Sequence, residues 1–330
     1  MNVLVAGGAG YIGSHAVKQL LEAGHKVVVA DNLFRGHAKA VNQAATFCQL
    51  DLADTDGLAG VMRQHQIDCV MHFAALAYVG ESVTQPLMYY DKNTAGTVSL
   101  LKAMHTAGVR RMVFSSTCAT YGEPPATPIV ETMSQKPINP YGWSKLFVER
   151  VLIDYAASAP DFAFAALRYF NVAGAAADGS IGEDHDPETH LIPVVLQAAL
   201  GQREKVTVFG TDYPTPDGTC IRDYVHVEDL CDAHIVVMEA LKAGDQRFYN
   251  LGIGSGYSVK QVIDAAWAVT GLTIPVDYGP RRPGDPPSLF ADASKVRREL
   301  GWSARYTDLE KIVATAWQWH KNHPHGYDDK

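Results

Sequence analysis

The sequence predicts an α/β protein, in which a doubly wound parallel sheet is joined to a second, smaller α/β domain. In the first half of the 330-residue chain, short apolar runs alternate with amphipathic stretches. This alternation is typical of parallel strands buried between helices. After about residue 171 the elements become shorter and turn-rich loops separate them, which indicates a separate unit. We therefore expect one domain over 1–171 and a second over 172–330, with some segments of the second packing on the first.

The individual elements follow from the same patterns. Apolar runs predict strands of the first domain at 3–6, 26–30, 46–49, 69–73, 111–115 and 163–168. Helical spacing predicts helices near 12–23, 54–65, 86–107 and 141–158. In the second half we expect helices at 190–201, 226–243 and 258–270, and strands at 205–209, 248–252 and 274–278. Loops rich in Gly, Pro and Asp lie at 175–188, 210–219 and 279–288.

Composition excludes several classes of protein. The formal net charge of −8 argues against a nucleic-acid binder, so any phosphate must be met by a local site. The five cysteines are dispersed and form no CxxC pair, which indicates reduced thiols without a disulfide framework or a zinc site. No secretory signal precedes the first strand and no apolar run could span a bilayer. We expect a soluble cytoplasmic protein with no membrane partner.

The first strand runs into a glycine-rich segment, Gly7-Gly8-Ala9-Gly10-Tyr11-Ile12-Gly13. Its GxxGxxG spacing is a variant of the Rossmann dinucleotide fingerprint. Gly7 permits the tight turn, Gly10 lets the backbone approach a pyrophosphate, and Gly13 allows close packing of helix and strand. Taken alone, the motif is equally compatible with a turn that binds nothing.

Acidic residues strengthen the dinucleotide interpretation. The second strand ends in Asp31, about 20 residues beyond the glycines, where a carboxylate accepts the ribose hydroxyls of adenosine. The same negative charge disfavours a 2′-phosphate, so we expect NAD as the cofactor instead of NADP. Asp51 and Leu52 close the third strand and are expected beside the adenine ring.

Tyr141 and Lys145 lie four residues apart on a predicted helix, so both side chains share one face. A free phenol has a pKa of about 10, but a nearby lysine and a cationic nicotinamide both favour the phenolate. Tyr141 could then accept a proton from a hydroxyl as hydride leaves its carbon. Thr117, at the end of an upstream strand, supplies a bridging hydroxyl. An ordinary amphipathic helix is the alternative interpretation of the pair.

At this point the chain resembles the UDP-glucose 4-epimerase family, also called UDP-galactose 4-epimerase, of the extended short-chain dehydrogenases/reductases. The resemblance covers essentially the whole chain. It depends on the strings GGAGYIGSH (7–15), DNL (31–33), HFAA (72–75), VGES (79–82), YGWSK (141–145), LRYFNVAGA (167–175), HLIP (190–193), GTCIRDYVHV (218–227), YNLG (249–252) and RRPGD (281–285).

The resemblance implies roles for particular residues. The implied catalytic residues are Tyr141, Lys145 and Thr117. The implied NAD contacts are Gly7, Gly10, Tyr11, Ile12, Gly13, Asp31, Asn32, Asp51, Leu52, Phe73, Ala74, Ala75, Asn93, Ser115, Tyr141, Lys145 and Phe170. The implied UDP-sugar contacts are Thr117, Tyr141, Asn171, His190, Leu191, Val206, Val208, Phe209, Arg222, Arg282, Asp285 and Leu289. The guanidinium forks among them suit a diphosphate.

The implied reaction inverts the C4 hydroxyl of a UDP-hexose through transient oxidation by tightly held NAD, interconverting UDP-galactose and UDP-glucose. The chain departs from many members at three positions. Thr117 replaces serine and keeps the hydroxyl. Ala77 replaces a lysine near the pyrophosphate, which predicts weaker NAD binding. His190 replaces asparagine, and we expect its charge to vary near neutral pH.

Several points stay open at the level of sequence. Leu289 occupies a position that varies between tyrosine and small residues in the family, so UDP-N-acetylhexosamines are also conceivable substrates. A homodimer is implied, through the helices near 86–107 and 141–158. The acidic loop with Glu183, Asp184, His185, Asp186, Glu188 and His190 resembles a metal site, but hydride transfer needs no metal and we expect a polar loop.

Three rival functions fit the sequence less well. Nucleotide-sugar 4,6-dehydratases place an Asp-Glu pair directly after the hydroxyl residue, and UDP-glucuronate decarboxylases need a comparable glutamate. Here Cys118, Ala119 and Thr120 follow, which cannot carry out that acid–base chemistry. A non-catalytic NAD sensor would be expected to have lost the tyrosine–lysine pair, which is intact.

Overall fold

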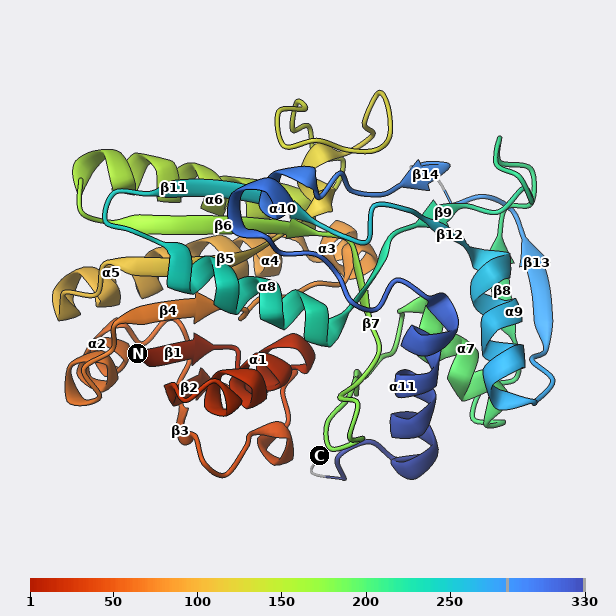
Figure 1. Ribbon diagram of the computed structural model, residues 1–330, viewed down its shortest axis with the longest axis horizontal. Coiled ribbons are helices and arrows are strands. Elements are labelled where there is room, and N and C mark those ends of the chain that lie inside the picture. The colour runs from red at the N-terminus through yellow and green to blue at the C-terminus, as the bar shows by residue number, and fades with distance from the viewer. Residues whose placement is uncertain (283–284, 329–330) are drawn as a thin grey trace.

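The computed structural model describes residues 1–282 and 285–328 (Figure 1). Pro283 and Gly284, which belong to the RRPGD string, and residues 329–330 lie outside the described part.

A seven-stranded sheet forms the centre of the molecule, in the order β11-β6-β5-β4-β1-β2-β3. Every neighbouring pair in it is parallel. The strands are β1 (Asn2–Ala6), β2 (Lys26–Asp31), β3 (Thr46–Gln49), β4 (Cys69–His72), β5 (Arg111–Thr117), β6 (Ala163–Tyr169) and β11 (Gln246–Leu251). Apolar runs therefore predicted these strands to within about two residues, and the expected fold class is confirmed.

Helices cover both faces of this sheet. One face packs against α1 (Tyr11–Glu22), α8 (Val227–Ala240) and α10 (Ser294–Leu300), and the other against α2 (Thr55–Gln64), α5 (Gly96–Ala107) and α6 (Pro140–Ser158). Each face has its own hydrophobic cluster of fully buried side chains. Burial on both faces explains why the central strands are almost continuously apolar.

The prediction of one continuous helix over 86–107 is wrong. The segment after α3 (Val79–Thr84) consists of α4 (Pro86–Tyr89), a π-helical turn (Tyr90–Ala95) and then α5. The wide turn contains Asn93, whose amide accepts from the Leu76 backbone N–H at 2.8 Å and donates to the Leu76 carbonyl at 3.0 Å. Such turns occur mostly at functional sites, and this one fixes the loop that follows β4.

The second half of the chain contributes a smaller layer beyond the carboxyl ends of the sheet, on the right in Figure 1. Its helices are α7 (Leu191–Ala199), α9 (Val259–Thr270) and α11 (Leu309–Asn322), which share a third hydrophobic cluster. Its parallel pairs are β8 (Val206–Phe209) with β13 (Val276–Gly279) and β7 (Asn171–Ala173) with β10 (Tyr224–His226). A three-stranded sheet joins β9 (Ile221–Arg222) to β12 (Tyr257–Ser258) and β14 (Ser288–Leu289).

Two segments of this half return to the main sheet, since β11 pairs with β6 and α8 packs beside α1. Short 3₁₀ turns lie at Ala38–Ala40 and Cys118–Tyr121. All five cysteines are free thiols. Within residues 1–282 and 285–328, no helix combines the length and the apolar character needed to cross a bilayer.

Candidate active site

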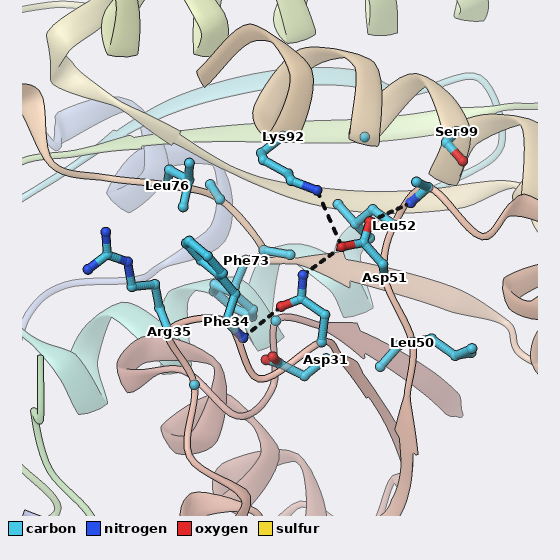
Figure 2. A pocket seen from close by; sticks show the side chains of 18 of the residues that line it. Asp31, Phe34, Arg35, Leu50, Asp51, Leu52, Phe73, Leu76, Lys92 and Ser99 are labelled. Carbon is cyan, nitrogen blue, oxygen red and sulfur yellow. Dashed lines mark hydrogen bonds and ion pairs between the residues drawn. The ribbon is translucent and has the colours of Figure 1, made fainter. Parts of the chain in front are cut away.

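A cavity of about 380 Å³ opens at the carboxyl ends of β1, β2 and β4 (Figure 2). Open parallel sheets bind ligands at this edge. Nine of the residues predicted to contact NAD line the cavity: Gly7, Gly10, Asp31, Asn32, Asp51, Leu52, Phe73, Ala74 and Ala75. Segments that are far apart in the sequence therefore meet where the resemblance placed them.

Two glycines of the dinucleotide motif, Gly7 and Gly13, are required by geometry. Gly7 has φ +82°, and a Cβ there would lie 2.4 Å from the Ala74 nitrogen. A Cβ on Gly13 would lie 2.0 Å from the Gly7 carbonyl oxygen. Gly10 has more room, since its nearest such contact is 3.5 Å away, and it is the N-cap of α1. A diphosphate can thus approach the first turn of α1, where backbone N–H groups and the helix dipole favour an anion.

Two carboxylates line the far end of the cavity. Asp31 accepts from the backbone N–H groups of Ala9, at 3.0 Å, and Leu33, at 2.8 Å, while burial raises its pKa. Asp51 accepts from Asn32 at 2.7 Å. The backbone N–H of Ala53, and then Asn32 and Lys92, lower the pKa of Asp51. This end is acidic and suits ribose hydroxyls more than an extra phosphate.

The predicted catalytic side chains come together beside β5. Asn139 caps α6 by accepting from the Gly142 N–H at 2.8 Å, which starts the helix one residue before Tyr141. The Thr117 hydroxyl is hydrogen-bonded to the Tyr141 phenol. Lys145 donates to the Ser115 carbonyl at 2.8 Å and lies 4.9 Å from the centre of the Phe114 ring.

Burial dominates the protonation of this pair. It raises the pKa of Tyr141 to about 12 and lowers the pKa of Lys145 to about 7. The expectation that a nearby lysine and a cationic nicotinamide together favour the phenolate stays a prediction. The ammonium is directed at the Ser115 carbonyl, and the dominant effect on the phenol is loss of water.

A buried ion pair, which the sequence did not indicate, holds the catalytic helix in place. Glu149 on α6 accepts from Arg168 on β6 at 2.7 and 3.0 Å, and from Ser116 on β5 at 2.6 Å. The side chains of Arg168 and Glu149 are only 5% and 2% exposed. The pair therefore ties α6 to two central strands directly behind Tyr141.

Two of the predicted UDP contacts, Arg282 and Asp285, line a second cavity of about 530 Å³ together with Tyr213. Arg222 forms an ion pair with Asp285, and the Arg282 guanidinium lies 4.0 Å from the centre of the Phe209 ring. Val206 and Val208 bury their side chains in the core, at 1% and 2% exposed. Any ligand contact at these two positions therefore falls to the backbone.

Three further predicted residues line neither cavity. Asn171 begins β7, beside Tyr224. Leu289 is paired in register with Arg222 and packs in one apolar cluster with Phe170. A change of side chain at position 289 therefore alters the packing against Phe170.

His190 lies directly before α7, which begins at Leu191. Although burial alone would lower it, Glu183 and Glu188 raise the pKa of His190 to about 10. The expectation that its charge varies near neutral pH is therefore wrong, because these carboxylates keep the imidazole protonated.

Arg35 also lines the first cavity, and sequence reasoning missed it. The guanidinium donates to Glu81 at 2.8 Å and to the Asp186 carbonyl at 2.7 Å, and it lies 4.7 Å from the centre of the Tyr78 ring. Figure 2 shows it pointing away from Asp31 and Asp51, on the side of Leu76. The sequence does contain one signal for this residue. Arg35 is a basic residue shortly after the DNL string, in a chain that lacks a lysine at position 77.

Comparisons with known proteins agree with this geometry. Residues 3–252 match the NAD dependent epimerase/dehydratase family. The chain is 53% identical to the UDP-glucose 4-epimerase of Lacticaseibacillus casei, over the full length of both. It is also similar to a crystal structure of a UDP-glucose 4-epimerase, with TM-score 0.96 and 49% identity, covering 99% of this chain and 100% of the other. The Bifidobacterium longum enzyme in complex with NAD⁺ and UDP has TM-score 0.95 and 40% identity, with 99% and 100% covered. The chain therefore belongs to the NAD-dependent epimerase/dehydratase family.

Proposed function

We propose that this protein is a UDP-glucose 4-epimerase, which interconverts UDP-galactose and UDP-glucose with tightly bound NAD. The observation that carries the proposal is the cavity that the dinucleotide motif lines at the carboxyl ends of the central strands, together with the buried Tyr141 phenol beside Thr117 and with Lys145 fixed on the same helix. The catalytic, cofactor and substrate residues implied by the resemblance are proposed to act together in one site.

Bound NAD supplies a hydride acceptor and, in its oxidised form, a positive charge near the phenol. That charge offsets the burial that raises the pKa of Tyr141, because an opposite charge within a few ångströms favours the phenolate. Tyr141 then takes the C4 hydroxyl proton and later returns it, while Thr117 bridges the sugar oxygen and the phenol. Lys145, fixed on Ser115, positions the helix face and the nicotinamide ribose.

The arginines anchor the nucleotide while the sugar changes orientation. Arg222 and Arg282 come from β9 and from the loop before β14, and both are proposed to bind the diphosphate. Such fixation leaves the hexose free to present either face of C4. Net redox change is absent, since the hydride returns to the same carbon.

We further propose that Arg35 meets the cofactor pyrophosphate in place of the lysine that Ala77 replaces. Its contacts with Glu81 and the Asp186 carbonyl hold the guanidinium at the cavity wall. A guanidinium forms bidentate, charge-assisted bonds with phosphate.

A homodimer in the cytoplasm is the proposed working form. An apolar patch on α3, α4 and α6 supports it, with Val83 at 62% and Leu87 at 81% exposed and with the exposed rings of Trp143 and Phe147 in contact on α6. Contiguous exposed apolar surface of this kind marks an interface. Leu87→Glu should convert the dimer to a monomer in light scattering, and a protein that is monomeric without the change would contradict the proposal.

Turnover without added NAD tests the function directly. The purified protein is incubated with UDP-galactose or with UDP-N-acetylgalactosamine, and the sugars are followed by proton NMR. We expect UDP-galactose to give UDP-glucose, with the same final ratio of the two sugars reached from either epimer. Turnover of UDP-N-acetylgalactosamine would show whether the site also accepts N-acetylated sugars. Tyr141→Phe should lose nearly all turnover while retaining nucleotide, whereas Tyr155→Phe should keep its turnover, because Tyr155 lies on the same helix but its hydroxyl is hydrogen-bonded to His105. Near wild-type turnover by Tyr141→Phe would refute the assignment.

A further inference from the structure

Four side chains of the loop between β7 and α7 point at one another. Glu183, His185, Glu188 and His190 each offer one ligand atom, and these atoms all lie within 4.8 Å of one another. The His190 Nδ1 lies 2.9 Å from an oxygen of Glu183 and 2.9 Å from an oxygen of Glu188. The His185 Nδ1 lies 3.1 Å from the same Glu183 oxygen and 3.7 Å from Glu188.

These distances are those of a compact coordination shell. A tetrahedral zinc site, with bonds of about 2.0–2.2 Å, places neighbouring ligand atoms about 3.3–3.6 Å apart. Three of the separations between histidine nitrogens and carboxylate oxygens, at 2.9, 2.9 and 3.1 Å, are slightly shorter, and the 3.7 Å separation from His185 to the other Glu188 oxygen is slightly longer. Two imidazole nitrogens and two carboxylate oxygens are also a normal donor set for a borderline-soft ion.

The surroundings hold the four groups in this arrangement. The Glu188 carboxylate accepts from the backbone N–H groups of Thr189, at 2.7 Å, and His190, at 2.8 Å. The His185 ring meets the edges of Tyr11 and Tyr78, at centroid distances of 6.2 and 5.9 Å. The Tyr78 hydroxyl, on a residue only 9% exposed, has no hydrogen-bond partner among the described residues. The backbone hydrogen bonds to Glu188 are outer contacts of the kind that orient metal ligands.

Access and charge also suit an ion. Both glutamate side chains are 4% exposed, whereas the His190 side chain is 35% exposed, so an ion can enter past His190. Metal ligands must be deprotonated. Each histidine Nδ1 lies within hydrogen-bond distance of a glutamate oxygen, so an ion binds there by displacing the protons of these bonds. A divalent cation would also compensate the two buried carboxylates.

We propose that Glu183, His185, Glu188 and His190 bind one transition-metal ion, Zn²⁺ in the first instance. The ion fixes the loop that delivers His190 and Leu191 to the substrate side, and hydride transfer does not pass through it. Metal-bound His190 keeps its Nε2 for a ligand. The binding step releases two protons and forms four metal–ligand bonds.

The test uses the full-length holoenzyme, freed of metal with a chelator and titrated with Zn²⁺ by calorimetry and with Co²⁺ by visible absorption. We expect one ion per chain, the intense visible bands of tetrahedral Co²⁺, and about two protons released per Zn²⁺ when buffers of different ionisation enthalpy are compared. His185→Gln and Glu188→Gln should abolish the bands. His325→Gln, an exposed histidine near the C-terminus, should keep them.

If the chelated wild-type protein takes up no stoichiometric ion, or if the Co²⁺ bands persist in both quartet variants, the four residues form only an ion-pair network and the proposal fails. Should either variant fail to fold, the wild-type stoichiometry and the proton release still decide the question. These readouts are independent of epimerase turnover, so failure here and failure of the proposed function are distinguishable.

Discussion

Replacing Arg35 with alanine removes the cation that we place at the cofactor pyrophosphate. A hydrogen bond to a charged group contributes about 1.5–3 kcal/mol. The Arg35 side chain is 25% exposed, so partial solvation favours the lower part of this range. A loss of about 1.5–2 kcal/mol of binding free energy raises the dissociation constant for NAD roughly 10- to 30-fold.

Two measurements check this magnitude. One is the amount of NAD that stays with each chain after gel filtration, and the other is the dissociation constant of the stripped protein by calorimetry. Arg110→Ala is the matched control, because Arg110 forms an exposed ion pair with Asp161 at the amino end of β5. Adding Ala77→Lys to Arg35→Ala should restore much of the affinity. An unchanged dissociation constant in Arg35→Ala would show that Arg35 only braces the 183–190 loop.

Further changes address stability, acid sensitivity and substrate width. Glu149→Gln strips the buried Arg168 of its counter-charge, which should cost about 3–5 kcal/mol; an unshifted urea midpoint would contradict the role of this pair. Burial lowers the pKa of His234 from 6.5 to about 4, so between these values the unfolded chain binds a proton that the folded chain excludes, and stability falls as the pH drops through this window. His234→Leu should make the urea midpoint less dependent on pH between 7 and 5, and an equally steep decline would count against the assignment. Leu289→Tyr should reduce turnover of UDP-N-acetylgalactosamine more than that of UDP-galactose, and equal losses would remove Leu289 as the gate.

The sequence predicted the central sheet well because its strands are buried on both faces. A strand of this kind is apolar at nearly every position, so Val3, Val28 and Phe164 mark it without knowledge of their neighbours. The turn at Gly7 and the pairing of Tyr141 with Lys145 on one helix face were equally local. Gly7 follows directly from its place in the turn, which needs a positive φ. The shared direction of Tyr141 and Lys145 follows from the helical repeat alone.

Other features required neighbours that the sequence does not place. The strands β7, β9, β10, β12 and β14 have two or three residues each, which is too short for any periodicity to appear. The π-helical turn exists because Asn93 reaches Leu76 and Ser144. Neither partner is close to it in the chain.

The sequence and the tertiary structure likewise determined different parts of the chemistry of the site. The sequence alone determined which groups are present: a phenol, an ammonium, a glycine-lined turn and two histidines among carboxylates. Their protonation was decided by the tertiary structure, because desolvation and charges from distant segments set a pKa. Burial therefore opposes ionisation of Tyr141, carboxylates that fold back on His190 keep it charged, and a contact across 151 residues, from Arg35 to Asp186, brings a cation to the cofactor cavity.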